Sequence, residues 1–109
     1  MNNYSRNEIV LLRYPFSDLS NFKIRPAIVV NEHYPSYDLI IIPLTSKTSN
    51  LLPGEFILNN YIKSGLNVST SVKRGFYTID NRLVVQSVGY IFGTDVEQLN
   101  ISIKKWLAI

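Results

Sequence analysis

The sequence predicts a mainly β fold, a small barrel of short strands closed by one C-terminal helix. Two observations favour this class. Runs rich in β-branched, aliphatic and aromatic residues recur along residues 8–92 and are separated by polar or proline-containing loops, which is typical of strands. The hydrophobic spacing then changes to that of a helix, with Val96, Leu99, Ile103 and Trp106 on one face.

The first half of the chain predicts three strands, at residues 8–14, 24–31 and 38–45. Residues 15–23 separate the first two and hold Pro, Ser, Asp and Asn, which break strands. Pro26 has no N–H for a ladder hydrogen bond, so the start of the second strand is expected on an edge or at a bulge. The third run is the most apolar and is expected to be buried on both faces.

The second half alternates shorter strands with turns. Three further strands are expected, at residues 55–58, 70–79 and 83–92. Residues 59–68 are compatible with one helical turn that ends at Gly65. The last two strands are expected to form a pair joined by residues 80–82. Gly75 and Gly89 inside them indicate bulges or a barrel corner.

The C-terminal helix is expected over residues 95–107. Thr94 followed by Glu97 matches a capping box, in which two side chains satisfy free backbone N–H groups. Lys104 and Lys105 in the last turn complement the helix dipole. The apolar face predicts that the helix packs on the sheet.

Composition excludes several functional classes. The net charge of +3 and pI of about 9.3 are compatible with an anionic partner such as nucleic acid. The absence of cysteine excludes disulfides, cysteine-ligated zinc and thiol nucleophiles. His33 is the only histidine, which excludes a two-histidine ribonuclease in one chain. We expect it on the surface. We expect one domain over residues 1–109, with no cofactor and no metal site. Because no signal peptide opens the chain and the apolar run 39–44 is short, a soluble cytoplasmic protein is expected.

Five segments, in this order and before a C-terminal helix, carry a family resemblance: YPFSDL (14–19), IRPAIVV (24–30), IPLTSK (42–47), LPGEFIL (52–58) and GLNVSTSVKRGFYTID (65–80). From about Glu8 to Leu107 the chain resembles the PemK branch of the MazF/PemK toxins. The resemblance implies an SH3-like, or CcdB-like, barrel that forms homodimers and binds single-stranded RNA in a groove. It also implies metal-free cleavage that leaves a 2′,3′-cyclic phosphate and a 5′-hydroxyl, and a cognate antitoxin that blocks the groove.

The resemblance places the family's catalytic arginine at Arg25 and its catalytic hydroxyl at Thr45, with Ser46 as a neighbouring RNA-binding residue. RNA supplies its own nucleophile, the 2′-OH, so the enzyme must chiefly stabilise negative charge on phosphorus. An arginine fork suits phosphate oxygens, and a hydroxyl adds a further hydrogen bond. Arginine is a poor acid or base, which favours an electrostatic role. Taken alone, the residues also fit a solvated strand-edge cation and a turn cap.

Four other cations are candidate RNA contacts: Lys23, Lys47, Lys73 and Arg74. Within a strand, neighbours 73 and 74 would point to opposite faces, so that one reaches RNA and the other solvent. MazF itself tends to have an acidic or amide residue near this point, which leaves base specificity open.

The loop at residues 15–23 contains further candidates. Family members have a mobile loop here that shapes the RNA groove, and Phe22 is a candidate for stacking on a base. Phe16 is better explained as part of the core, and Asp18 as a turn cap.

Two other functions remain compatible with the sequence. The same barrel serves CcdB, which binds DNA gyrase and performs no chemistry, and the apolar C-terminal residues 106–109 resemble a partner-binding end. Such a protein would not require Arg25 and Thr45 together. The second alternative is a catalytically silent RNA-binding domain, which sequence separates poorly from an active enzyme.

Overall fold

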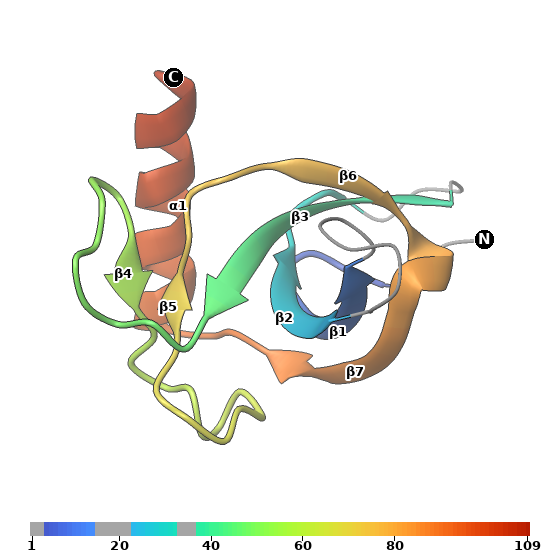
Figure 1. Ribbon diagram of the computed structural model, residues 1–109. Helices are drawn as coiled ribbons and strands as arrows, with labels where there is room; N and C mark the ends of the chain where they lie inside the picture. Colours follow the sequence, from blue (N-terminus) through green and yellow to red (C-terminus); the bar gives the residue numbers. More distant parts are fainter. Residues whose placement is uncertain (1–3, 15–22, 33–36) are drawn as a thin grey trace.

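The computed structural model describes residues 4–14, 23–32 and 37–109. A curved antiparallel sheet of seven strands is followed by one α-helix (Figure 1). The strands are β1 (Glu8–Tyr14), β2 (Lys23–Val29), β3 (Asp38–Thr45), β4 (Phe56–Ile57), β5 (Ser71–Val72), β6 (Tyr77–Asp80) and β7 (Val84–Tyr90). A short 3₁₀ helix, η1 (Asn81–Leu83), precedes β7, and the helix α1 spans Thr94–Leu107. The predicted mainly β fold with a C-terminal helix is confirmed.

The centre of the sheet is formed by β1, β2 and β3, which carry most of the buried aliphatic side chains. The strand order is β4-β5-β3-β2-β1-β7, with β6 paired to β3 beside this path. Pro26 faces Leu11 of β1, but it lies before Ala27, the first residue that β2 pairs with β3. At Pro26 the strand is therefore an edge on its β3 side, as predicted. Residues 39–45 are buried or half-buried throughout, which confirms the core position of β3.

Two clusters of buried side chains form the core. One lies between the sheet and α1 and contains Ile9, Ile28, Ile42, Leu44, Leu58, Val72, Ile91 and Leu99. The other lies inside the curve of the central strands and contains Val10, Leu12, Ala27, Val29, Leu39, Ile41 and Ile79. Burial of these side chains supplies the main favourable term in folding.

Helix α1 packs as its hydrophobic spacing predicted. Leu99 is fully buried, and Val96, Ile103 and Trp106 pack on the same cluster. In the described part of the chain, no helix has the length and hydropathy needed to cross a bilayer.

The predicted capping box is wrong. The helix begins one residue earlier than expected, at Thr94, and its N-cap is Gly93, which makes no side-chain cap hydrogen bond. Gly93 has φ of 61°, a left-handed conformation that suits glycine. The chain therefore enters the helix through this glycine, which moves Thr94 from the capping position into the first turn.

The predicted strand pair in the second half is also wrong. Residues 70–79 form two short strands, β5 and β6, separated by a break that contains Gly75 with φ of 151°. Strand β6 pairs with β3, whereas β7 pairs with β1. Figure 1 shows these two strands passing on opposite sides of β1 and β2, joined by η1. The 3₁₀ turn redirects the chain, so the two runs do not form a hairpin.

Two glycines in this half, Gly65 and Gly89, lie where the sequence indicated a turn end and a bulge. The β1–β7 register shifts between Ile9 and Val10, so a bulge lies next to Gly89, as predicted. Residues 59–68 contain one helical hydrogen bond, from the Ser64 N–H to the Asn60 carbonyl, and the turn ends at Gly65 with φ of 99°. No helix is assigned there, but the expected turn is present.

Candidate active site

Arg25 and Thr45 meet at the end of the β2–β3 ladder. The last pair of that ladder is Ala27 with Pro43, so Arg25 and Thr45 each lie two residues beyond it, on neighbouring strands. Both line a pocket of about 250 Å³. The other lining residues are Pro26, Leu44, Ser46, Lys47, Leu66, Val68 and Thr70. The fold therefore brings together two residues that lie twenty positions apart in the sequence.

The Thr45 hydroxyl is oriented by the turn that follows β3. Its Oγ1 accepts a hydrogen bond from the Lys47 N–H at 3.2 Å. The Lys47 carbonyl in turn accepts one from Ser71 Oγ at 2.6 Å. Thr45 thus caps this turn, as the structural interpretation of the sequence suggested. Because the hydroxyl acts there as an acceptor, its own proton is available to a ligand oxygen in the pocket.

The Arg25 side chain is exposed and carries an uncompensated charge. Within residues 4–14, 23–32 and 37–109, its guanidinium makes no hydrogen bond or ion pair to another residue. An arginine that supports the fold is commonly bound to a carboxylate or a carbonyl, because its five donors need acceptors. Arg25 instead keeps its donor fork free at the edge of the pocket.

A second pocket of about 300 Å³ adjoins the first and shares Thr45 and Lys47 with it. It is further lined by Ser49, Asn50, Leu51, Leu52, Glu55, Ser71 and Lys73. The Glu55 carboxylate is held in place by two backbone donors, Leu52 N–H at 2.7 Å and Arg74 N–H at 2.8 Å. Together the two pockets are lined by three cations and one carboxylate, which suits an anionic ligand.

The structure assembles some of the predicted RNA-binding residues and leaves others apart. Ser46 and Lys47 line the first pocket, and Lys73 lines the second. Arg74 and Lys23 are exposed but line neither pocket. The alternation argument for residues 73 and 74 is wrong, because β5 ends at Val72 and both residues lie in the break before β6.

Four predicted positions lie outside the described residues: Phe16, Asp18, Phe22 and His33. Their expected roles stay predictions. Among the residues that the structure does describe, no group of three or more His, Cys, Asp or Glu side chains is arranged to hold a metal ion.

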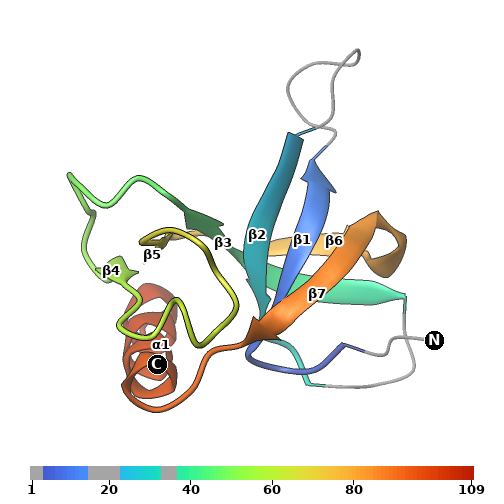
Figure 2. The ribbon, with the colours of Figure 1, turned by 90° about the horizontal axis from the view of Figure 1, so that it is seen from below.

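Sequence reasoning missed one wall of the first pocket. Leu66, Val68 and Thr70 come from the segment between β4 and β5, far from Arg25 in the sequence. Figure 2 shows this segment beside α1 and the end of β7. In the run LNVSTS (66–71), the lining residues Leu66, Val68 and Thr70 alternate with the polar residues Asn67, Ser69 and Ser71, and this was the available signal. The alternation indicates that the two faces of this run differ in chemistry, but it does not predict which part of the fold each face contacts.

Helix α1 supports the turn beside the second pocket. Buried Ser102 donates from Oγ to the Gly54 carbonyl at 2.7 Å, and Trp106 Nε1 donates to the Pro53 carbonyl at 2.9 Å. An added Cβ at Gly54 would lie 2.4 Å from Trp106 Nε1, and φ there is +88°. Only glycine therefore allows this close approach without strain. The apolar helix end is used, at least through Trp106, to hold the turn in place.

The curved sheet, the C-terminal helix and the two adjoining pockets lined by Arg25, Lys47 and Lys73 define a small mainly β protein with a cationic candidate site. Residues 5–107 match the family model described as PemK-like, MazF-like toxin of type II toxin–antitoxin system. The chain therefore belongs to the PemK-like, MazF-like family of type II toxins.

Solved structures share the fold at low sequence identity. An endoribonuclease in complex with its cognate antitoxin, from a Mycobacterial species, is 13% identical, with a TM-score of 0.80, covering 97% of this chain and 96% of that one. Mycobacterium tuberculosis toxin MazF-mt6 is 17% identical, with a TM-score of 0.75 and coverage of 94% and 97%. A MazE–MazF structure from Deinococcus radiodurans is 13% identical, with a TM-score of 0.78 and coverage of 99% of both chains. No curated protein matches the chain in sequence.

Proposed function

We propose that this chain is a metal-independent endoribonuclease that cleaves single-stranded RNA by directing the 2′-OH onto the adjacent phosphate. The observation that carries the proposal is the convergence of Arg25 and Thr45 on one pocket. Neither residue needs the other for folding, because Arg25 is unpaired among the described residues and the Thr45 proton is free. This free donor capacity at one pocket supports the proposal that a phosphate binds there.

In the proposed reaction, the 2′ oxygen forms a bond to phosphorus and the bond to the 5′ oxygen breaks. One proton leaves the 2′ oxygen and one arrives at the departing 5′ oxygen, which leaves a 2′,3′-cyclic phosphate and a 5′-hydroxyl. The phosphorane between them carries additional negative charge on its non-bridging oxygens. Donors already aimed at those oxygens stabilise this state more than the ground state, which lowers the barrier.

Each candidate site residue that lines the two pockets has a role in this reaction. Arg25 offers a planar pair of N–H donors to the phosphate, and Thr45 donates its hydroxyl proton to the same group. Ser46 and Lys47 hold the phosphate or a neighbouring one, and Lys73 extends the cationic track into the second pocket. The described lining of the first pocket holds no carboxylate or imidazole, so the contribution we assign to it is electrostatic.

The proposal includes partners and location. The relatives described above include an endoribonuclease bound to its cognate antitoxin and a MazE–MazF pair. By family membership we expect this toxin to have its own antitoxin, to form a homodimer and to act in the cytoplasm on single-stranded RNA. The positive lining of the double pocket supports an anionic partner.

The direct test is incubation of the purified protein with a long single-stranded RNA in EDTA, followed by mapping of the fragment ends. We expect discrete cuts that leave a cyclic phosphate, made by the native protein and not by the Arg25→Ala variant. Folded native protein that leaves the RNA intact would overturn the proposal and favour the gyrase-type or silent-binder alternatives. A matched control is Arg6→Ala, since Arg6 is an exposed arginine that bonds Asn100 and lines neither pocket.

A further inference from the structure

Asp95, the second residue of α1, is a buried carboxylate that accepts hydrogen bonds from a segment outside the helix. Asp95 is only 1% exposed. Its Oδ1 accepts the Asn59 N–H at 2.8 Å, and its Oδ2 accepts the Asn60 N–H at 3.0 Å. Burial of a carboxylate is unfavourable unless its oxygens are paired, and here both oxygens have a donor. The first turn of a helix also favours negative charge.

The two donors mark the start of the segment that ends in the pocket wall. The Leu58 N–H donates to the Thr70 carbonyl at 2.9 Å, so the ends of residues 58–70 are joined to each other. Towards its second end, the segment contributes Leu66, Val68 and Thr70 to the lining of the pocket that also holds Arg25 and Thr45. Asp95 therefore holds the segment at its base, and the wall begins six residues after Asn60, at Leu66.

The middle of the segment, at Ser64 and Gly65, is packed closely against β7. An added Cβ at Gly65 would lie 2.5 Å from the Val88 carbonyl oxygen, and one at Gly89 would lie 2.4 Å from the Ser64 carbonyl oxygen. Backbones in such close contact move together, because interiors are packed as densely as crystals. The Ser64 and Leu66 N–H groups donate to the Asn60 and Tyr61 carbonyls, so we expect a displacement at Asn59 and Asn60 to reach the start of the pocket wall.

We propose that Asp95 is a positioning residue of the active site: it fixes the 58–70 segment so that its wall stands at the correct distance from Arg25 and Thr45. This inference rests on the proposed function. Asp95 does not line the pocket that holds Arg25, so it acts on the substrate only through this wall. The helix is then more than a cover for the core, because its N-terminal end sets the width of the site.

The test compares Asp95→Asn with Glu97→Gln, which removes an exposed carboxylate from the same helical turn. The amide of Asp95→Asn has one acceptor oxygen and directs its NH₂ group at a backbone N–H, so one of the two bonds is lost. We expect KM for RNA to rise and kcat/KM to fall about 10- to 100-fold, the size of effect that follows a small misplacement of a site. Glu97→Gln should match the native protein.

Two further readouts separate positioning from general loss of stability. Amide hydrogen exchange in Asp95→Asn should accelerate at Ser64 and Leu66, whose N–H groups bond within the segment, while β1 and β2 remain protected. Assays well below the melting temperature keep the variant folded. If Asp95→Asn does not fold, Asp95→Ser, which retains one acceptor, is expected to show the same KM increase and local exchange.

The outcomes of these experiments distinguish a failure of the positioning role of Asp95 from a failure of the proposed RNA cleavage. A native protein that cuts RNA, beside a folded Asp95→Asn or Asp95→Ser with native KM, kcat and cleavage sites, refutes the inference alone. Unchanged exchange at Ser64 and Leu66 refutes it as well. A native protein that never cuts RNA refutes the proposed function, and the positioning role falls with it.

Discussion

Arg25 and Thr45 lie just beyond the last pair of the β2–β3 ladder, Ala27 with Pro43, and line the same pocket. We expect both groups to donate to one phosphate, and no described residue forms a hydrogen bond or ion pair with the Arg25 guanidinium. Replacements of Arg25, Thr45 and Ser102 test this site and the contacts that support it, and a fourth prediction concerns an ion pair outside it.

Two replacements of Arg25 should distinguish the contribution of its positive charge from that of its two parallel N–H donors. Arg25→Ala is expected to reduce kcat/KM for RNA cleavage about 100- to 1,000-fold, the usual effect of losing one preorganised donor to a charged transition state. Arg25→Lys should recover only part of the rate, because an ammonium cannot present two parallel N–H donors. Steady-state cleavage of a short RNA containing the mapped site measures both. Full activity in Arg25→Ala would remove this residue from the site.

The hydroxyl of Thr45 is expected to matter more than its methyl group. Thr45→Ser keeps the acceptor for the Lys47 N–H and the free proton, so it should retain activity within a few-fold of native. Thr45→Ala loses both and should be slower by about 10- to 100-fold or more. Single-turnover kinetics compares the two variants. Equal rates for Thr45→Ala and Thr45→Ser would argue against a hydroxyl at the phosphate.

Ser102 links α1 to the turn beside the second pocket, and its loss should be costly for stability. Ser102→Ala leaves the Gly54 carbonyl without its donor in a buried position, which is expected to lower the free energy of unfolding by about 1–3 kcal/mol. Urea denaturation measures this. Lys105→Ala, an exposed change in the same helix, should stay within about 0.5 kcal/mol of native. A native midpoint for Ser102→Ala contradicts the linkage.

An ion pair away from the site gives a pH signature. The Arg82 side chain, bonded to Asp80 at 2.7 Å, lowers the pKa of the Asp80 carboxyl from 3.8 to about 2. A carboxyl whose pKa is lower in the folded state stabilises that state at any pH above its unfolded-state pKa. This contribution is lost as the pH falls from the unfolded-state pKa through the folded-state pKa. The window is therefore about pH 4 to 2, and the effect is small because the pair is exposed.

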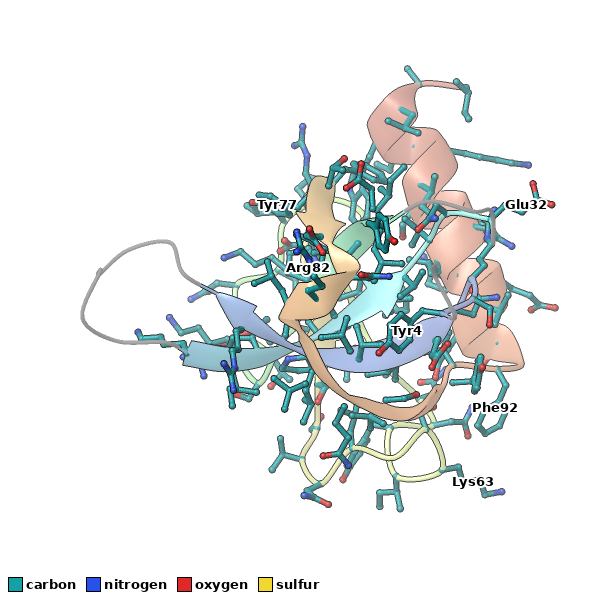
Figure 3. The ribbon with its side chains drawn as sticks, turned by 90° about the vertical axis from the view of Figure 1, so that its right-hand side faces the viewer. Tyr4, Glu32, Lys63, Tyr77, Arg82 and Phe92 are labelled. Carbon is teal, nitrogen blue, oxygen red and sulfur yellow. The ribbon has the colours of Figure 1, made fainter. Side chains whose placement is uncertain are left out.

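The Arg82→Ala variant tests this assignment by NMR titration. The pKa of Asp80 should return towards 3.8, while RNA cleavage at neutral pH should be unchanged. Figure 3 shows Arg82 on the turn before β7, well separated from Lys63 on the segment that walls the pocket. An Asp80 pKa that stays near 2 in the variant would mean that another group lowers it.

Much of the fold could be predicted because local patterns decide it. The apolar runs of β1 to β3 and the spacing of Leu99 and Trp106 in α1 reflect burial, which hydrophobic periodicity reports directly. The capping box failed because Thr94 lies one residue inside the helix, a difference set by the conformation of Gly93. The predicted hairpin failed because strand pairing is a tertiary choice, and Asp80 begins a 3₁₀ turn rather than a hairpin turn.

The candidate site was predictable only in part, for a related reason. Arg25, Thr45, Ser46, Lys47 and Lys73 belong to motifs that a family resemblance can mark. The opposite wall and the anchor at Asp95 are contributed by long-range contacts, and neither has a distinctive residue pattern. In the sequence, Asp95 resembles any acidic residue in the first turn of a helix. Only the fold shows that its carboxylate accepts hydrogen bonds from Asn59 and Asn60.

The central claim is that the RNA's own 2′-OH is the nucleophile at the Arg25–Thr45 pocket. The most direct measurement uses two oligonucleotides that differ by one atom, an RNA with the mapped cleavage site and the same RNA with a single 2′-deoxy nucleotide on the 5′ side of the scissile phosphate. The account predicts that the first is cut to a cyclic phosphate and that the second binds but stays intact at that bond. Equal cleavage of both would contradict it.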